Sequence, residues 1–353
     1  MMGWFRNRQS TKDHLVVSWS GQTLAYVLAR GGSGQSHKVL KFGVENQSAG
    51  AGGLEEMVGR LKALGLGLED FRTSVMLHPE QYQLLRIRTP PVAPEELRAA
   101  ARFQILRMLD SPIDDVTIDV MRVGDGRSRG VGHPAGHLYV VAAKRAAIGS
   151  LIELSDAMRW TISVIDIQET AQRNLQNALV AREGQGRLDR AHAALMLLDP
   201  YFALLTVCVN GELFYTRRFN LPPGFAAGAW DEVGADGQRT PASALLSTPF
   251  DSESNAFGGR GDDEQASRFL LEVQRSLDLW DRIWTSLPLA GISMYAGARS
   301  ADLSSWLTRQ LGQPVQPMDV TAQFPGFAGK AMSEEASCMP LLGLLLRTEH
   351  RSI

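Results

Sequence analysis

Two histidines have the spacing of a metal-binding pair. His133 and His137 are four residues apart, and on a helix this spacing places two imidazoles on one face, where they can bind a metal ion. Pro134 and Gly136 lie between them, and both residues disfavour a helix. The sequence therefore favours two loop histidines over a metal site.

Four carboxylates gather a few residues upstream and could form an acid–base pair or a cation site. They are Asp110, Asp114, Asp115 and Asp119. Apolar residues alternate with Asp119 in the stretch 116–120, which predicts a strand whose Asp119 side chain faces solvent. We interpret the cluster as a solvated sheet edge rather than a catalytic group.

Other chemical signatures are weak. Arg217 and Arg218, with Arg6 and Arg8, could contact an anionic lipid or an acidic partner, but a solvated strand end explains the pair at 217–218 more simply. The sequence contains no G-x-x-x-x-G-K-[ST], G-x-S-x-G or H-E-x-x-H motif. Its two cysteines, Cys208 and Cys338, form no C-x-x-C pair, so neither a disulfide framework nor a zinc site is predicted.

Composition narrows the class of protein. Lys and Arg number 36 and Asp and Glu 38, a net charge of 36 − 38 = −2, which argues against a surface built to bind nucleic acid. The 353 residues, 44% of them hydrophobic, are enough for two or three domains of about 100 to 200 residues. No secretory signal is recognised, and Asp199-Pro200 interrupts the most apolar stretch, so we expect a cytosolic protein.

The elements of the first half alternate between strand and helix patterns. Pro94 and two glutamates predict a helix start, and Leu97, Ala101, Ile105 and Met108 predict one buried face of a helix that runs to about residue 110. The remaining predicted elements are a hairpin at 15–29, strands at 38–44, 74–77, 116–120, 137–143 and 162–167, and helices at 54–64, about 146–158 and 169–181.

The second half continues the α/β pattern. Asn210-Gly211 predicts a tight hairpin between strands 203–209 and 212–219. Residues 222–265 have no sustained period and predict a long mobile insertion. The remaining predicted elements are a helix at 266–284, a strand at 292–295, a helix at 302–311, an extended piece at 314–320 and a buried helix at 337–347.

Several stretches together resemble a known family. Residues 82–119 and 139–144 resemble the pilus assembly protein PilM, and in particular its relative MshI of the mannose-sensitive haemagglutinin (MSHA) pilus. The likeness continues, in order, through 163–171, 210–219, 272–278, 296–303, 311–315 and 342–347. It therefore covers nearly the whole chain.

The resemblance implies an α/β protein with the actin-like ATPase fold, similar to the cell-division protein FtsA. Two α/β lobes would face a nucleotide cleft, with a small subdomain inserted in the first lobe. The expected parts are a basic and aromatic tail (1–13), the β-rich core of the first lobe (14–82), the inserted subdomain (83–146), the rest of the first lobe (147–190), the second lobe (191–336) with a flexible insertion (222–265), and a C-terminal helix returning to the first lobe (337–353).

The family's first phosphate loop has the approximate pattern Asp-x-Gly-Ser-x-x-x-Lys. Here Ser18 occupies the aspartate position, Ser20 the glycine position and Ala25 the lysine position. A phosphate cradle needs close backbone approach and compensating charge, and this loop has lost both the carboxylate and the cation.

The other two nucleotide segments depart from the family pattern as well. The second phosphate loop keeps Asp199 but has Tyr201 at the glycine position, and the adenosine segment has Ala296 with the single glycine Gly297. Because all three segments depart from the family pattern, we expect a protein that is not an enzyme: a pseudo-ATPase with ATP and Mg²⁺ binding weak or lost and no other cofactor or metal.

The family also implies a partner. PilM docks the cytoplasmic tail of the inner-membrane protein PilN beside its extra subdomain, so we expect a scaffold held at the inner membrane through a PilN-like tail and other pilus inner-membrane proteins, with self-association as a further possibility and no nucleic acid. Phe103, Gln104 and Arg107 are the candidate docking residues, although core packing would explain Phe103 equally well. The alternatives are an active actin-like ATPase or sugar kinase, and a secretion component related to GspL, a family that usually continues into a membrane span.

Overall fold

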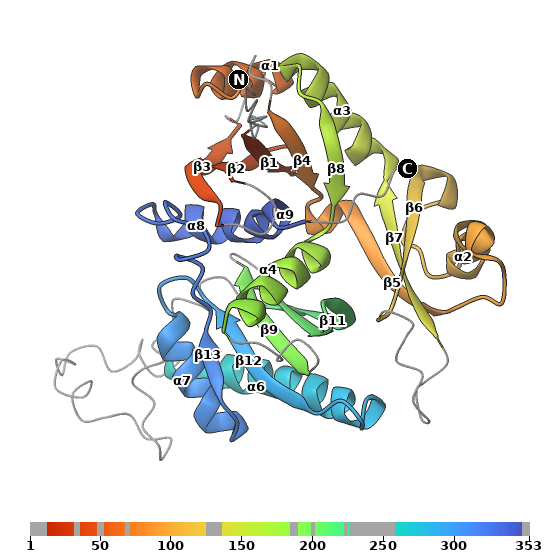
Figure 1. Ribbon diagram of the computed structural model, residues 1–353, viewed down its shortest axis with the longest axis vertical. Helices are drawn as coiled ribbons and strands as arrows, with labels where there is room; N and C mark the ends of the chain where they lie inside the picture. Colours follow the sequence, from red (N-terminus) through yellow and green to blue (C-terminus); the bar gives the residue numbers. More distant parts are fainter. Residues whose placement is uncertain are drawn as a thin grey trace, which may run out of the picture.

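A computed structural model describes residues 13–31, 36–47, 53–67, 71–124, 136–183, 190–198, 202–221, 225 and 258–347. These residues form two five-stranded mixed sheets and one three-stranded sheet (Figure 1). Helices lie on both faces of each large sheet, which is the layered arrangement expected of an α/β protein.

The first large sheet has the strand order β3-β2-β1-β4-β8. Its strands are β1 (His14–Trp19), β2 (Thr23–Arg30), β3 (Lys38–Asn46), β4 (Arg72–Met76) and β8 (Ile162–Asp166). The first three strands are antiparallel to one another, whereas β4 runs parallel to β1 and to β8. Helices α1 (Gly53–Ala63) and α3 (Arg145–Met158) pack on one face through Met57 and Leu151, because alternate strand residues such as Leu15 and Val17 point to that side.

The second large sheet repeats this pattern, with the order β11-β10-β9-β12-β13. Its strands are β9 (Ala191–Leu198), β10 (Phe202–Val209), β11 (Glu212–Asn220), β12 (Leu289–Tyr295) and β13 (Val315–Pro317). Asn210 and Gly211 both have positive φ, 52° and 82°, and confirm the hairpin that their sequence predicted. Helices α6 (Gly258–Ile283) and α7 (Ser300–Leu311) cover one face with the predicted apolar stripe of α6, from Phe269 to Trp280.

Between the two large sheets lies α4 (Gln168–Glu183), next to the C-terminal helices (Figure 1). Ala171 and Leu175 of α4 join a single apolar cluster that contains residues of both sheets, among them Val27 and Met196. The same helix carries buried amides: the Gln172 side chain donates to the backbone oxygens of Ala194 (2.9 Å) and Leu204 (3.0 Å). These bonds fix α4 to the second sheet, because a buried amide without partners would be costly.

The C-terminal segment packs against the first sheet as α8 (Met332–Cys338), a 3₁₀ turn (Met339–Leu341) and α9 (Leu342–Leu345). The prediction of one helix over 337–347 is wrong, since Pro340 lacks the N–H group that a continuous helix needs. Gly343 brings α9 against α4: a Cβ at this position would lie 1.9 Å from the carbonyl oxygen of Ala171. Only glycine allows this approach.

The small sheet has the order β5-β7-β6, from β5 (Tyr82–Arg88), β6 (Val116–Arg122) and β7 (His137–Lys144). One face is covered by α2 (Leu97–Ile105), whose Leu97, Ala101 and Ile105 are buried as predicted. Met108 was predicted on the same stripe but is 43% exposed, because α2 ends at Ile105 and the following turn directs the partly buried Leu109 to the core instead. Asp119 on β6 is exposed, as predicted.

The predicted insertion and the two predicted loop histidines lie in segments that the structure describes only in part. Helix α6 begins at Gly258, so residues 258–265 do not belong to an irregular insertion; the stretches 222–224 and 226–257 lie outside the described residues, as do the tail 1–12 and His133. His137 opens strand β7, and among the described residues no group of three or more His, Cys, Asp or Glu side chains could hold a metal ion.

Candidate functional site

The first predicted phosphate loop is the turn between β1 and β2. Ser18 pairs with Ala25 across the two strands, so the hairpin register places both positions at the same end of the sheet. Gly21 has φ +97°, and the Ser20 N–H donates to the Thr23 oxygen at 3.0 Å. The Thr23 N–H in turn donates to Ser20 Oγ at 3.2 Å. The turn is tight, and it uses two of its own N–H groups internally.

The side chains at this turn supply neither charge that a metal–phosphate group requires. Ser18 is 8% exposed and carries a neutral hydroxyl in place of a carboxylate. Ala25 is 6% exposed and belongs to the apolar cluster between the two large sheets, together with Val27 and Met339. No cation extends from this position toward the turn.

The corresponding turn of the second sheet connects β9 to β10. These strands pair as far as Leu198 and Phe202. Asp199 and Tyr201 lie between them, outside the described residues, so their predicted roles stay predictions.

The predicted adenosine segment follows β12. The Ala296 N–H donates to Ser300 Oγ (2.8 Å), and Ser300 Oγ donates to the Gly297 oxygen (2.7 Å). Gly297 has φ +58°, and Ala296 is 3% exposed. The segment is thus bonded to the first turn of α7, and its Ala296 N–H is already occupied.

A buried carboxylate that the sequence analysis did not select lies at the same end of the first sheet. Register pairs Val17 with Val75 and Val75 with Ile165, so Asp166, the next residue of β8, is level with Ser18, with β4 between them. Asp166 is 6% exposed. An acidic residue at the end of a strand, two positions before a helix, is typical of a helix start, which could have revealed it.

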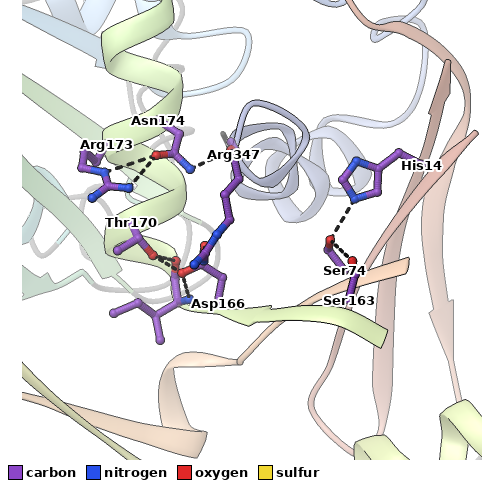
Figure 2. A network of polar contacts seen from close by, with 10 residues as sticks. His14, Ser74, Ser163, Asp166, Thr170, Arg173, Asn174 and Arg347 are labelled. Carbon is purple, nitrogen blue, oxygen red and sulfur yellow. Dashed lines mark hydrogen bonds and ion pairs between the residues drawn. The ribbon is translucent and has the colours of Figure 1, made fainter. Parts of the chain in front are cut away.

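Figure 2 shows how this carboxylate is satisfied. It accepts from the Ile167 N–H (2.9 Å) and from the Thr170 hydroxyl, and it forms an ion pair with Arg347, which follows α9. The C-terminal segment therefore supplies the counter-charge of Asp166. Nothing in the sequence indicates that pair, because 181 residues separate the partners.

The predicted docking residues lie on and just after α2. Phe103 is 74% exposed, which rules out core packing as the reason for it, and Gln104 and Arg107 are exposed as well. Leu106, 47% exposed, lies beside them, since positions i, i+3 and i+4 of a helical turn are neighbours. The other arginines of α2 are engaged: Arg102 pairs with Asp114 at 2.8 Å and Arg98 with Asp119 at 3.4 Å. An aromatic ring, a leucine and a cation therefore share one exposed surface, which we call the α2 surface.

The two α/β lobes and the three-stranded unit inserted in the first lobe have the actin-like ATPase fold, as predicted. The protein is similar in fold to PilM. A chain of the PilM–PilN type IV pilus biogenesis complex matches with a TM-score of 0.64 and 18% sequence identity, over 95% of this chain and 98% of that chain.

Other solved structures are less similar. The cytoplasmic domain of EpsL, an inner-membrane component of the type II secretion system of Vibrio cholerae, has a TM-score of 0.40 and 14% identity, with 59% of this chain and 71% of that chain covered. A Bacteroides thetaiotaomicron protein with an actin-like ATPase fold and unknown function has a TM-score of 0.45 and 8% identity, with 91% and 98% covered. No family model and no curated protein matches the chain. Within the part of the chain that the structure describes, no helix is both long and apolar enough to span a membrane.

Proposed function

We propose that this protein is a scaffold of a type IV pilus inner-membrane complex, of the MshI kind found in MSHA pili, and that it has lost ATP binding. The scaffold would be cytoplasmic and would lie on the inner membrane through its partners. The observation that carries the proposal is the pairing of Ser18 with Ala25 in an otherwise intact actin-like fold. The similarity to PilM supports the assembly context.

The loss of ATP binding follows from charge. A metal–nucleotide complex needs a carboxylate for the metal–water shell and a cation for the phosphates, and neither is present at the first turn. Of the carboxylates at that end of the sheet, Asp166 is buried and paired with Arg347, and Glu45 of β3 lies 3.8 Å from Arg60. Releasing Asp166 for a metal ion would break this buried ion pair.

Isothermal titration of the purified protein with ATP and Mg²⁺ tests this proposal. We expect no saturable heat at micromolar nucleotide, and an unchanged melting temperature in the same mixture, because a ligand that binds the folded state raises it. Micromolar binding of ATP·Mg would refute the loss of the site. ATP hydrolysis above the background of a matched buffer would favour an active ATPase.

The α2 surface would receive the partner tail. Phe103 and Leu106 supply apolar area, and Arg107 forms no ion pair within the described residues, so the tail would bring an apolar side chain and an acceptor for the guanidinium. The partner we propose is the cytoplasmic tail of a PilN-like inner-membrane protein.

Co-purification tests the docking. The full chain is co-expressed with a full-length PilN-like protein from the same source and captured from detergent extracts. Phe103→Ser and Arg107→Glu should each reduce the captured partner, whereas Glu95→Gln, an exposed change ahead of α2, should not. Truncation of the partner's tail should have the same effect as the two α2 variants. Undiminished capture in all of these variants would rule out the α2 surface as the docking site.

A further inference from the structure

Arg218 of β11 connects three parts of the molecule. Its guanidinium pairs with Glu169 at the start of α4 (2.7 Å) and donates to the Tyr82 hydroxyl at the start of β5. It also lies over the Tyr82 ring, 4.8 Å from the centroid. The interpretation of Arg217-Arg218 as a solvated strand end is therefore wrong for Arg218, which faces the junction of the second sheet, α4 and the small sheet.

The junction is polar but enclosed. The side chain of Glu169 is 2% exposed and that of Arg218 28%. The Tyr82 hydroxyl donates to Glu169 (2.6 Å) and accepts the Gln168 N–H (3.2 Å). Burial, reinforced by the Glu169 charge, raises the pKa of Tyr82 well above its ordinary value, so the phenol keeps the proton that it donates.

A second, apolar contact joins the same parts. The face of the small sheet opposite α2 presents Tyr139, which clusters with Cys208 and Leu213 of the β10–β11 hairpin. The Tyr139 hydroxyl donates to the Phe214 oxygen at 3.2 Å.

Gly124, after β6, extends this contact. Its N–H donates to the Leu213 oxygen at 3.2 Å, and a Cβ on it would lie 2.7 Å from the Phe214 ring. The small sheet thus contacts the second large sheet at two places, although in sequence it is inserted between β4 and β8 of the first.

We propose that Tyr82, Glu169 and Arg218 form a latch that fixes the small sheet and α2 to the second large sheet, so that these parts move as one body. Movement of the small sheet away from the second large sheet would have to separate the Tyr82 hydroxyl from Glu169 and Arg218 and open the Tyr139 cluster at the same time. The latch holds the lobes in one arrangement without a nucleotide. This inference depends on the contacts alone and not on the proposed function.

Distance measurement between two spin labels tests the latch in the full chain. Ala99→Cys on α2 and Gln310→Cys on α7 are exposed positions on the two bodies. The natural Cys208 and Cys338 are buried, and burial raises the pKa of each thiol to about 12, so they do not compete for label. The parent protein should give one narrow distance distribution.

Two changes should broaden that distribution about twofold, because more than one arrangement becomes populated. Glu169→Gln with Arg218→Met removes both charges together and leaves no buried ion unpaired. Gly124→Ala acts on the second contact without a change of charge. Arg217→Met is the matched control, since Arg217 pairs with Glu272 of α6 inside the second lobe, and it should leave the distribution narrow.

Circular dichroism establishes that each variant is folded. A broad distribution in the parent, or a narrow one in both folded test variants, overturns the proposal. ATP binding by the parent would refute the proposed function and leave this test unaffected.

Discussion

The crossing of α4 and α9 offers a sharp test of how the lobes are joined, through the change Gly343→Ala. The added Cβ would lie 1.9 Å from the Ala171 oxygen, 2.4 Å from its carbonyl carbon and 2.9 Å from its Cα. All three are backbone atoms of a helix that Gln172 holds to the second sheet, so they cannot turn away as a side chain could. The two helices must separate instead.

The expected cost follows from these contacts. Overpacking a core site costs about 1–3 kcal/mol. A clash with backbone atoms should cost about 3 kcal/mol, at the top of this range. The higher helix propensity of alanine offsets at most about 1 kcal/mol of that cost. The free energy of unfolding should therefore fall by about 2 kcal/mol, with a decrease in melting temperature of about 3 °C for a chain of 353 residues.

Gly149→Ala is the matched control. Gly149 lies inside α3, and a Cβ there meets no atom within 4 Å, so the same change should stabilise the protein by about 0.5–1 kcal/mol. Urea denaturation followed by circular dichroism gives both differences. A Gly343→Ala protein as stable as the parent would show that the α4–α9 contact is looser than the structure has it, and the argument for a rigid crossing would fail.

Three further predictions concern single residues. Burial, with a smaller contribution from the Arg72 charge, lowers the pKa of His14 from 6.5 to about 3. Between these two pH values the unfolded chain binds more protons than the folded protein, so the free energy of unfolding falls as the pH drops from 6.5 toward 3. His14→Gln should remove this dependence, so that the urea midpoint changes less with pH over that window. Cys208 and Cys338 should react with iodoacetamide at pH 8 only as the protein unfolds, and rapid labelling of the native protein, read by mass spectrometry, would contradict their burial. Phe103→Ala should change the free energy of unfolding by less than about 0.5 kcal/mol, because the side chain is exposed. Ile105→Ala, two residues away and fully buried, should lower it by about 2–5 kcal/mol. Equal losses in urea denaturation would show that Phe103 packs in the core.

The sequence predicted helices and strands well where the residues of a single segment determine its conformation. Asn210-Gly211 specified its hairpin because both residues accept the positive φ of the turn. Leu97, Ala101 and Ile105 marked the buried face of α2 through their helical spacing. The altered charges at Ser18 and Ala25 were inferred from the resemblance to the PilM family's first phosphate loop, and the observed hairpin register pairs these two positions.

Contacts between distant parts could not be inferred in this way. Arg217 and Arg218 are adjacent and chemically identical, yet one pairs within its lobe and the other lies at the three-way junction. Strand alternation directs the two side chains to opposite faces of the sheet, but their partners depend on which elements pack there: α6 for Arg217, and β5 and α4 for Arg218. The same holds for Asp166 and Arg347, since no local rule relates residues that only the chain's return to the first sheet brings together.

The proposed loss of ATP binding raises the question of which charges neutralise the buried carboxylates of the two lobes. A nucleotide and its metal ion, bound between the two lobes, would supply charges that hold the lobes together. The first turn of this protein has no charged side chain to bind them. Asp166 instead finds its cation in Arg347, from the C-terminal segment, and Glu169 finds its cation in Arg218, from the second lobe. Both carboxylates are buried next to the ends of β8 and α4, and a buried ion that loses its partner is strongly destabilising. Both ion pairs are therefore internal to the chain: Asp166–Arg347 joins the first sheet to the C-terminal segment, and Glu169–Arg218 joins α4 to β11.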